Sequence, residues 1–225
     1  MIDLKDLLLF LKRPYSGPRI DVVSIYSFFK LVGESIFIIF LIEISTSVAI
    51  LIPLKHFNLL PATQNLTFTT FNALKISIIL PVLEELIFRL PLKLSKSNIA
   101  IFLSLLLFVI LNKLNFYLAL SSSFLLFTFL LFIIKWEYLY YNWLYTKFNN
   151  NFTAFFYLQA FIFGTLHLTN YQLYIKYIYL FPLIVINYIL IGCFLGYIRV
   201  RYAYGIFACI VTHIVINSLY YLINF

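Results

Sequence analysis

Long apolar runs, separated by short polar stretches, dominate the chain. Two charge-free examples are the runs Ile99 to Leu111 and Phe124 to Ile134. A helix needs about 20 residues to cross the hydrocarbon core, where only helices and closed barrels satisfy all their backbone hydrogen bonds. A barrel would show short segments of alternating polarity instead. The pattern therefore predicts an all-α, polytopic transmembrane helical bundle.

The polar breaks predict about seven spans in a single integral membrane domain, residues 1–225. In chain order, these spans cover residues 24–52, 70–92, 98–111, 116–134, 152–168, 173–198 and 204–221. Pro182 is expected to kink the sixth span. The aromatic stretch 135–150 is expected at the headgroup level, where Tyr and Trp are enriched.

The charged N-terminal stretch, residues 1–22, indicates an interfacial segment that breaks at Pro14 and Pro18. If this segment is cytoplasmic, the seven spans place most basic residues in inner loops, as the positive-inside rule requires. The inner set is Lys5, Lys12, Arg13, Arg19, Lys93, Lys96, Lys135, Lys147, Arg199 and Arg201, and the outer set is Lys55, Lys113 and Lys176. A cytoplasmic N-terminus is therefore predicted.

Composition supports a membrane solvent and argues against nucleic acid as a partner. Hydrophobic residues make up 64% of the 225 residues and charged residues 11%, whereas soluble domains are about half apolar and a quarter charged. The net charge is +8, but the basic residues stand singly or in pairs at the ends of apolar runs. They are expected to anchor the chain to anionic headgroups rather than to line a nucleic-acid groove.

The second predicted span carries an unusual group of charges, Glu84, Glu85 and Arg89. A charge at the centre of a span costs about 2.5–3.5 kcal/mol, so such residues need a partner or a function. Glu85 and Arg89 are four residues apart and can pair on one helix face. Glu84 points about 100° away and is left as a candidate general base. Glu43, central in the first span without a local partner, could line the cavity or bond Ser45, Ser47 or another helix, and it is not included among the site residues.

Two histidines and an asparagine lie within later spans. His167 ends the stretch Phe163-Gly-Thr-Leu-His167, and His213 precedes Asn217 by one helical turn. One carboxylate, two imidazoles and an amide form a hydrolytic set, because the carboxylate can take a proton from water and the N–H groups can stabilise an oxyanion. Glu84, His167 and His213 also match the ligand set of a catalytic zinc. The residues alone leave both chemistries open.

Three motifs occur here in a fixed order: Glu84-Glu85-Leu-Ile-Phe-Arg89, Phe163-Gly-Thr-Leu-His167 and His213-Ile-Val-Ile-Asn217. With them, residues 78–220 resemble the CPBP family of intramembrane peptidases, which includes the type II CAAX prenyl proteases and the bacteriocin-processing, Abi-like proteins. The gap between the first and second motifs is longer than is usual in this family. That departure leaves the route of substrate entry, and with it specificity, undefined.

The resemblance implies a glutamic peptidase whose active site lies inside the membrane. Glu84 would activate water with the assistance of His167, and His213 and Asn217 would form the oxyanion site. Supporting positions are implied for Glu85, Arg89 and Phe163. No cofactor is expected; if the enzyme needs a divalent metal such as zinc, its ligands would be Glu84, His167 and His213.

The implied substrate is a peptide or protein, membrane-anchored or lipidated, and the implied location is the inner or plasma membrane of a bacterium. Two other functions remain open. A proton-coupled transporter could use the glutamates and histidines as a relay, although Asn217 does not titrate and no inverted repeat is visible in the sequence. A non-catalytic membrane scaffold or immunity protein could keep the same fold.

Overall fold

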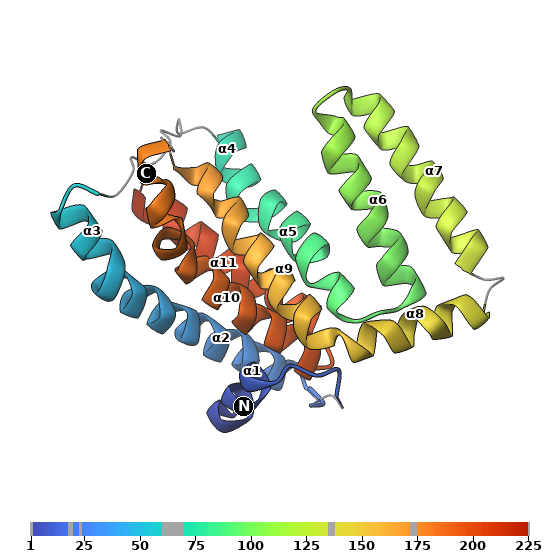
Figure 1. Cartoon of the computed structure of the whole chain (residues 1–225), viewed down its shortest axis with the longest axis horizontal. Coiled ribbons are helices and arrows are strands. Elements are labelled where there is room, and N and C mark those ends of the chain that lie inside the picture. The colour runs from blue at the N-terminus through green and yellow to red at the C-terminus, as the bar shows by residue number, and fades with distance from the viewer. Residues whose placement is uncertain are drawn as a thin grey trace.

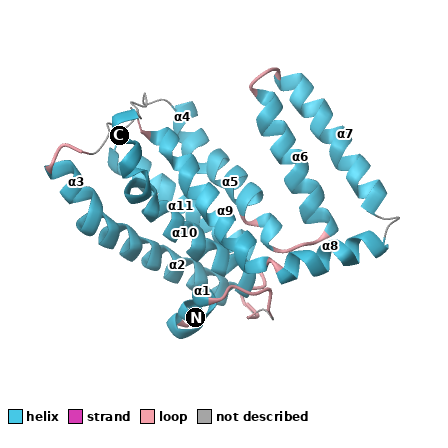
Figure 2. Cartoon of the chain, in the orientation of Figure 1, coloured by secondary structure: helices cyan, strands magenta, loops and turns pink. Residues whose placement is uncertain are grey.

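The computed structural model describes residues 2–17, 20–22, 24–59, 70–134, 138–171 and 175–224, and these residues are almost entirely helical (Figure 1, Figure 2). The α-helices are α1 (Leu4–Lys12), α2 (Ile25–Thr46), α3 (Ile52–His56), α4 (Thr70–Leu74), α5 (Leu80–Phe88), α6 (Lys96–Asn112), α7 (Phe116–Ile134), α8 (Tyr138–Asn150), α9 (Phe152–Leu166), α10 (Phe181–Arg201) and α11 (Gly205–Asn224). The predicted all-α class is confirmed.

Short segments of other helix types join several of these helices. Two π-helical segments, η1 (Ser47–Leu51) and η2 (Lys75–Ile79), connect α2 to α3 and α4 to α5. Three 3₁₀ segments are η3 (Leu90–Leu92), η4 (His167–Asn170) and η5 (Ile175–Leu180). The second predicted span is therefore one helical run with a π segment in its middle.

The span count agrees only roughly with the prediction. Within the described residues, four helices are long and apolar enough to cross a membrane: Ile25–His56, Phe152–Asn170, Ile178–Arg201 and Gly205–Ile223. The apolar helices Lys96–Asn112 and Phe116–Phe132 are shorter. The N- and C-termini lie at opposite ends of the bundle (Figure 1).

Pro182 does not kink a span, so that prediction was wrong. It lies in the first turn of α10, where the missing N–H of proline costs no helical hydrogen bond. The fixed backbone angle of proline there favours the start of a helix. Residues 173 and 174, which the sequence assigned to the same span, lie outside the described residues.

Helix α10 is the centre of the bundle and packs against α9, α11 and α2. Two glycines allow α9 to approach it closely. A Cβ atom on Gly192 would lie 3.2 Å from the Phe163 ring, and one on Gly196 would lie 2.7 Å from the Phe156 ring. These contacts hold both halves of α9, which ends next to His167, against the core.

Helices α6 and α7 form a hairpin to one side of the bundle (Figure 1). Small residues are buried in both helices, Ala100 and Ser104 in α6 and Ala119 and Ser123 in α7. Small side chains allow close backbone approach between helices in a membrane. The large side chains of α7, such as Phe124 and Phe129, remain exposed and are available to lipid.

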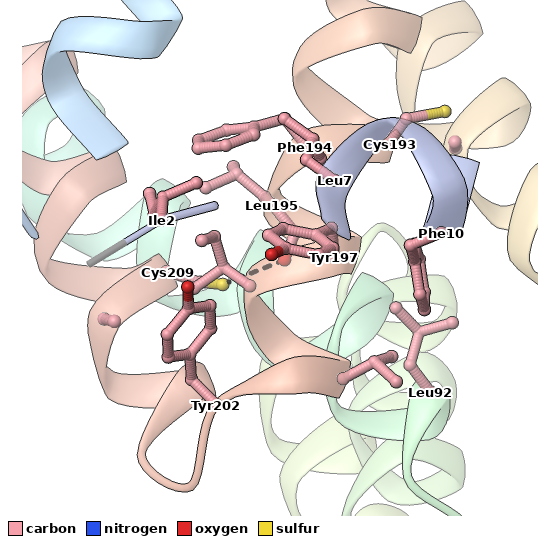
Figure 3. Close-up of a cluster of buried hydrophobic side chains, with 14 of the residues drawn as sticks. Ile2, Leu7, Phe10, Leu92, Cys193, Phe194, Leu195, Tyr197, Tyr202 and Cys209 are labelled. Carbon is pink, nitrogen blue, oxygen red and sulfur yellow. Dashed lines mark hydrogen bonds between the residues drawn. The ribbon is translucent and has the colours of Figure 1, made fainter. Parts of the chain in front are cut away.

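The N-terminal segment packs against the bundle rather than only lying beside it. Phe10 of α1 is fully buried and contacts Tyr197 and Phe156 edge to face, at centroid distances of 5.3 Å each. Figure 3 shows this cluster, with Leu92 of η3 next to Phe10. Helix α1 ends before Pro14, as expected, whereas Pro18 lies outside the described residues. Placement of residues 1–22 at the headgroup level stays a prediction.

Asp6 of α1 holds this end of the bundle through buried donors on α10. Its carboxylate accepts hydrogen bonds from Tyr197 at 2.9 Å and from Arg201 at 2.9 and 3.0 Å. Burial raises the pKa of Asp6, but the hydrogen bonds from Arg201 and Tyr197 outweigh it, and the pKa lies below its usual value. Because the pKa of Asp6 is lower in the folded state, the contact stabilises the fold at pH values above the ordinary pKa of an aspartate side chain.

The Asp6→Asn variant is expected to unfold at a lower temperature than the wild type at neutral pH. The difference should shrink below about pH 4, as the wild-type carboxylate takes up a proton on passing its folded-state pKa. Unfolding temperatures measured between neutral and acidic pH test this, with the exposed Asp21→Asn as the control. A difference that persists at low pH would show that the contribution of Asp6 does not come from its charge.

Candidate active site

A fully buried ion pair lies at the end of α5. Arg89 Nε is 3.4 Å from Glu85 Oε2, and both side chains are 0% exposed. The guanidinium also stacks over the ring of Phe163, 4.1 Å from its centroid. The structure thus contains the pair that the four-residue spacing predicted, and α9 supplies an aromatic surface for its cation.

His213 of α11 lies between the two adjacent glutamates. Its Nδ1 is 2.9 Å from Glu85 Oε1, and its Nε2 is 3.7 Å from Glu84 Oε2. Because Arg89 pairs with Glu85, the Glu85 carboxylate is the acceptor and Nδ1–H the donor. The Nε2 atom therefore faces Glu84, whose side chain is 31% exposed as a whole, although the Oε2 atom that faces His213 is buried and accepts no hydrogen bond from a described residue.

Asn217 is tied to the π segment that precedes α5. Its Nδ2 donates to the carbonyl of Ile76 at 3.3 Å. In this segment the N–H of Leu80 bonds to the carbonyl of Lys75, five residues earlier. By the same spacing, the carbonyl of Ile76 would need an N–H from residue 81, which is Pro81 and has none. The Asn217 amide supplies that missing donor.

His167 follows α9 and opens η4. Its Nδ1 lies 2.9 Å from the carbonyl oxygen of Phe163, which can only accept, so Nδ1 carries the proton. In the neutral imidazole the Nε2 lone pair is then free to accept a hydrogen bond. Tyr188 of α10 stacks on the ring with a centroid distance of 4.2 Å and fixes its plane.

Phe163 links the separate parts of the site. Its ring centroid is 4.7 Å from that of His167 and 6.2 Å from that of His213. The same ring carries the Arg89 guanidinium. An aromatic residue at this position thus sets the spacing between the two imidazoles and the ion pair.

A cavity of about 50 Å³ opens between these helices. It is lined by Ile39, Glu43, Phe163, His167, Tyr188, Ile191, Leu195, His213, Ile216 and Asn217. A water molecule occupies about 30 Å³ in the liquid, so the cavity has room for one or two. Three of the four predicted catalytic residues therefore meet at a water-sized space, and Glu84 joins them through His213.

Glu43 also lines the cavity, which was one of the positions that the sequence left open for it. It sits centrally in the first span without a local ion-pair partner, and that isolation is the signal that could have identified it. The hydrophobic periodicity of α2 by itself does not show which neighbouring helix Glu43 faces.

A larger depression of about 890 Å³ lies on the α6–α7 hairpin. Its lining residues are Asn115, Tyr117, Leu118, Leu120, Ser121 and Phe124. These side chains include neither a carboxylate nor an imidazole, so this surface lacks the hydrolytic set. The chemistry is concentrated in the smaller cavity.

The alternative of a metal site rests on Glu84, His167 and His213. Among the described residues, no group of three or more His, Cys, Asp and Glu side chains could hold a metal ion. In the structure, His213 is held through Nδ1 by Glu85 and His167 through Nδ1 by a carbonyl, and such contacts leave both Nε2 atoms available as ligands. The absence of a cofactor stays a prediction.

Comparison with known families identifies one match. Residues 120–219 match the family described as type II CAAX prenyl endopeptidase Rce1-like. Searches of curated proteins and of solved structures gave no match. The matched region contains His167, His213 and Asn217 but begins after Glu84 and Glu85, and it is the packing of α5 against α11 that brings the glutamates to it.

Proposed function

Because residues 120–219 match the family described as type II CAAX prenyl endopeptidase Rce1-like, we propose that this protein is an intramembrane endopeptidase that acts by glutamate-activated water. Its substrate is a membrane-associated peptide or protein, with or without a lipid anchor. The observation that carries the mechanism is the position of His213, bonded to Glu85 and facing Glu84 beside a water-sized cavity.

Glu84 is the general base in this proposal. It takes a proton from a water molecule, whose oxygen attacks the carbonyl carbon of the scissile peptide bond. Collapse of the tetrahedral intermediate breaks the C–N bond, and the proton held by Glu84 passes to the leaving amine. The exposure of Glu84 and its distance of 3.7 Å from His213 Nε2 support this role.

His213 and Asn217 stabilise the negative oxygen of the intermediate. With Nδ1–H donated to Glu85, a second proton on Nε2 points a donor toward Glu84 and the reacting oxygen. With that proton present, two carboxylates, one imidazolium and one guanidinium balance in formal charge. The Asn217 amide has two N–H groups, and only one is used by the carbonyl of Ile76. Donors held in place before the reaction are the main source of oxyanion stabilisation.

Three residues position these groups without touching the substrate. Glu85 fixes the ring orientation and the Nδ1 proton of His213, as a carboxylate does for a catalytic histidine. Arg89 keeps Glu85 ionised, and Phe163 packs against both Arg89 and His213. His167 assists Glu84 by accepting a hydrogen bond from water through its free Nε2.

The basic residues at one end of the bundle support a cytoplasmic N-terminus. Arg199 donates to the carbonyl of Arg89 at 3.0 Å, and Lys93 donates to the carbonyl of Tyr202 at 3.3 Å. Arg201 binds Asp6 of α1 at the same end. A concentration of positive charge next to the N-terminal helix is typical of the cytoplasmic side, and in a bacterium the protein would lie in the inner or plasma membrane.

A peptide library incubated with the purified protein in lipid nanodiscs tests the function. We expect the wild type to cleave peptides both with and without a chelator. The Glu84→Gln variant, which serves as the matched control, should not cleave them. Loss of cleavage on chelation would contradict the water-activation role of Glu84 and would favour Glu84, His167 and His213 as metal ligands. Wild-type protein that cleaves neither prenylated nor unmodified peptides would favour a proton relay or a scaffold.

A further inference from the structure

Glu43 lies on the face of α2 that packs into the bundle. Ile39, one turn earlier, is 1% exposed, and Thr46, on the same face, is 8% exposed. The Thr46 hydroxyl lies 3.0 Å from Asn187 Oδ1 and so fixes the register of α2 against α10. The Glu43 side chain consequently lines the cavity that also touches His167 and His213.

The carboxylate of Glu43 lacks a partner within the described part of the chain. It forms neither a hydrogen bond nor an ion pair with any described residue, and no lining residue of the cavity is a Lys or Arg. The single nearby guanidinium, Arg89, is already paired with Glu85. An unpaired carboxyl group at membrane depth is costly and is normally found where it binds an ion or a substrate.

The excess of carboxylates indicates the charge of the missing partner. Arg89 and the His213 imidazolium of the proposed mechanism balance Glu84 and Glu85 in charge. Glu43 is then the carboxylate left without a cation among the described residues at this site. A cationic group that enters the cavity would restore the balance. At about 50 Å³ the space suits a compact ammonium group rather than the wider, planar guanidinium.

We propose that Glu43 binds an ammonium group of the substrate within the active-site cavity, and that the enzyme therefore prefers peptides with this group next to the scissile bond. Because His167, His213 and Asn217 line the same cavity, a group bound to Glu43 lies next to the scissile bond. The ammonium belongs to a lysine side chain. This preference rests on the proposed peptidase function and specifies its substrate class.

The test uses peptides that differ only in the residue next to the scissile bond: lysine, its uncharged isostere norleucine, or arginine, each with a free or acetylated N-terminus. The wild type should cleave the lysine peptide with the higher kcat/KM. Glu43→Gln should lower the lysine-to-norleucine ratio of kcat/KM about tenfold or more, since a desolvated charge loses its partner. The ratio should be the same with a free and with an acetylated N-terminus, because the charge that Glu43 binds is on the side chain. A preference lost on acetylation would overturn the proposal.

Glu34→Gln is the matched control, because Glu34 is on the same helix but its carboxylate binds the backbone N–H of Ile2 at 2.6 Å. This variant should keep the wild-type ratio. A Glu43→Gln ratio equal to that of the wild type, or a wild type without any lysine preference, would overturn the proposal.

Binding separates this proposal from the peptidase mechanism. Labelled lysine and norleucine peptides are titrated into Glu84→Gln and into the double variant Glu43→Gln/Glu84→Gln. Tighter binding of the lysine peptide to the single variant, lost in the double variant, would support the ammonium site even if no peptide were cleaved by the wild type. Equal binding of both peptides to Glu84→Gln would reject the site while leaving the hydrolytic mechanism intact.

Discussion

Replacing Glu84 by glutamine is expected to lower the rate of peptide hydrolysis about 10²–10⁴-fold, the usual contribution of a general base. Glutamine has the same shape as glutamate but cannot accept a proton from water. The contact of Glu84 with His213 is long, at 3.7 Å, and its side chain is partly exposed. The substitution should therefore leave the fold and its unfolding temperature close to those of the wild type.

Single-turnover cleavage, with the variant in excess over a fluorogenic peptide, measures the chemical step directly. Circular dichroism and the unfolding temperature confirm that the variant is folded. Glu34→Gln, which makes the same substitution on α2 away from the cavity, should retain wild-type rates. If Glu84→Gln cleaved at a rate within a few-fold of the wild type, Glu84 would not be the base, and water activation would have to come from His167.

Replacing Arg89 by methionine should destabilise the protein by about 3–5 kcal/mol, the cost of leaving one member of a buried ion pair without its partner. Arg89 and Glu85 are both fully buried, so no solvent reaches the carboxylate that remains. The contact between the guanidinium and the Phe163 ring is lost at the same time. Methionine is close to arginine in length and limits the cavity that the substitution creates.

The double variant Glu85→Gln/Arg89→Met separates this electrostatic cost from the loss of packing. Its destabilisation should be smaller than the sum of the two single effects, because removing both charges leaves neither unpaired. Reversible unfolding in mixed micelles gives the three free energies of unfolding. Strictly additive effects would show that Glu85 and Arg89 contribute independently, and the assignment of Arg89 as the partner that keeps Glu85 ionised would then be wrong.

Local spacing was sufficient to predict much of the fold and one contact of the site. Apolar runs predicted the helices because a segment in a bilayer must satisfy its own backbone hydrogen bonds. The Glu85–Arg89 pair followed from the four-residue spacing on one helix. The start of α10 was misjudged because the apolar run around Pro182 continues through the residues that form η5, and apolarity does not distinguish a 3₁₀ segment from an α-helix.

Contacts between helices could not be derived in the same way. The spacing of Glu84 and Glu85 shows that they point in different directions, but only the packing of α5 against α11 reveals that both face His213. Similarly, Phe10 reads as part of a short apolar run, whereas its burial against Tyr197 depends on the path of the chain after α1. Such pairings depend on the rotation and depth of each helix, which single-helix periodicity leaves free.

Pro81 takes no part in the proposed reaction, but it affects the position of Asn217 through the hydrogen bond between Asn217 and the carbonyl of Ile76. If residue 81 had an N–H group, that group would compete with Asn217 for the carbonyl of Ile76, and the amide could rotate away. Pro81 thereby couples the depth of α11 to the helix that carries both glutamates. Substitutions at positions 81 and 217 should therefore be interdependent, although the two side chains belong to different helices and only one of them faces the cavity.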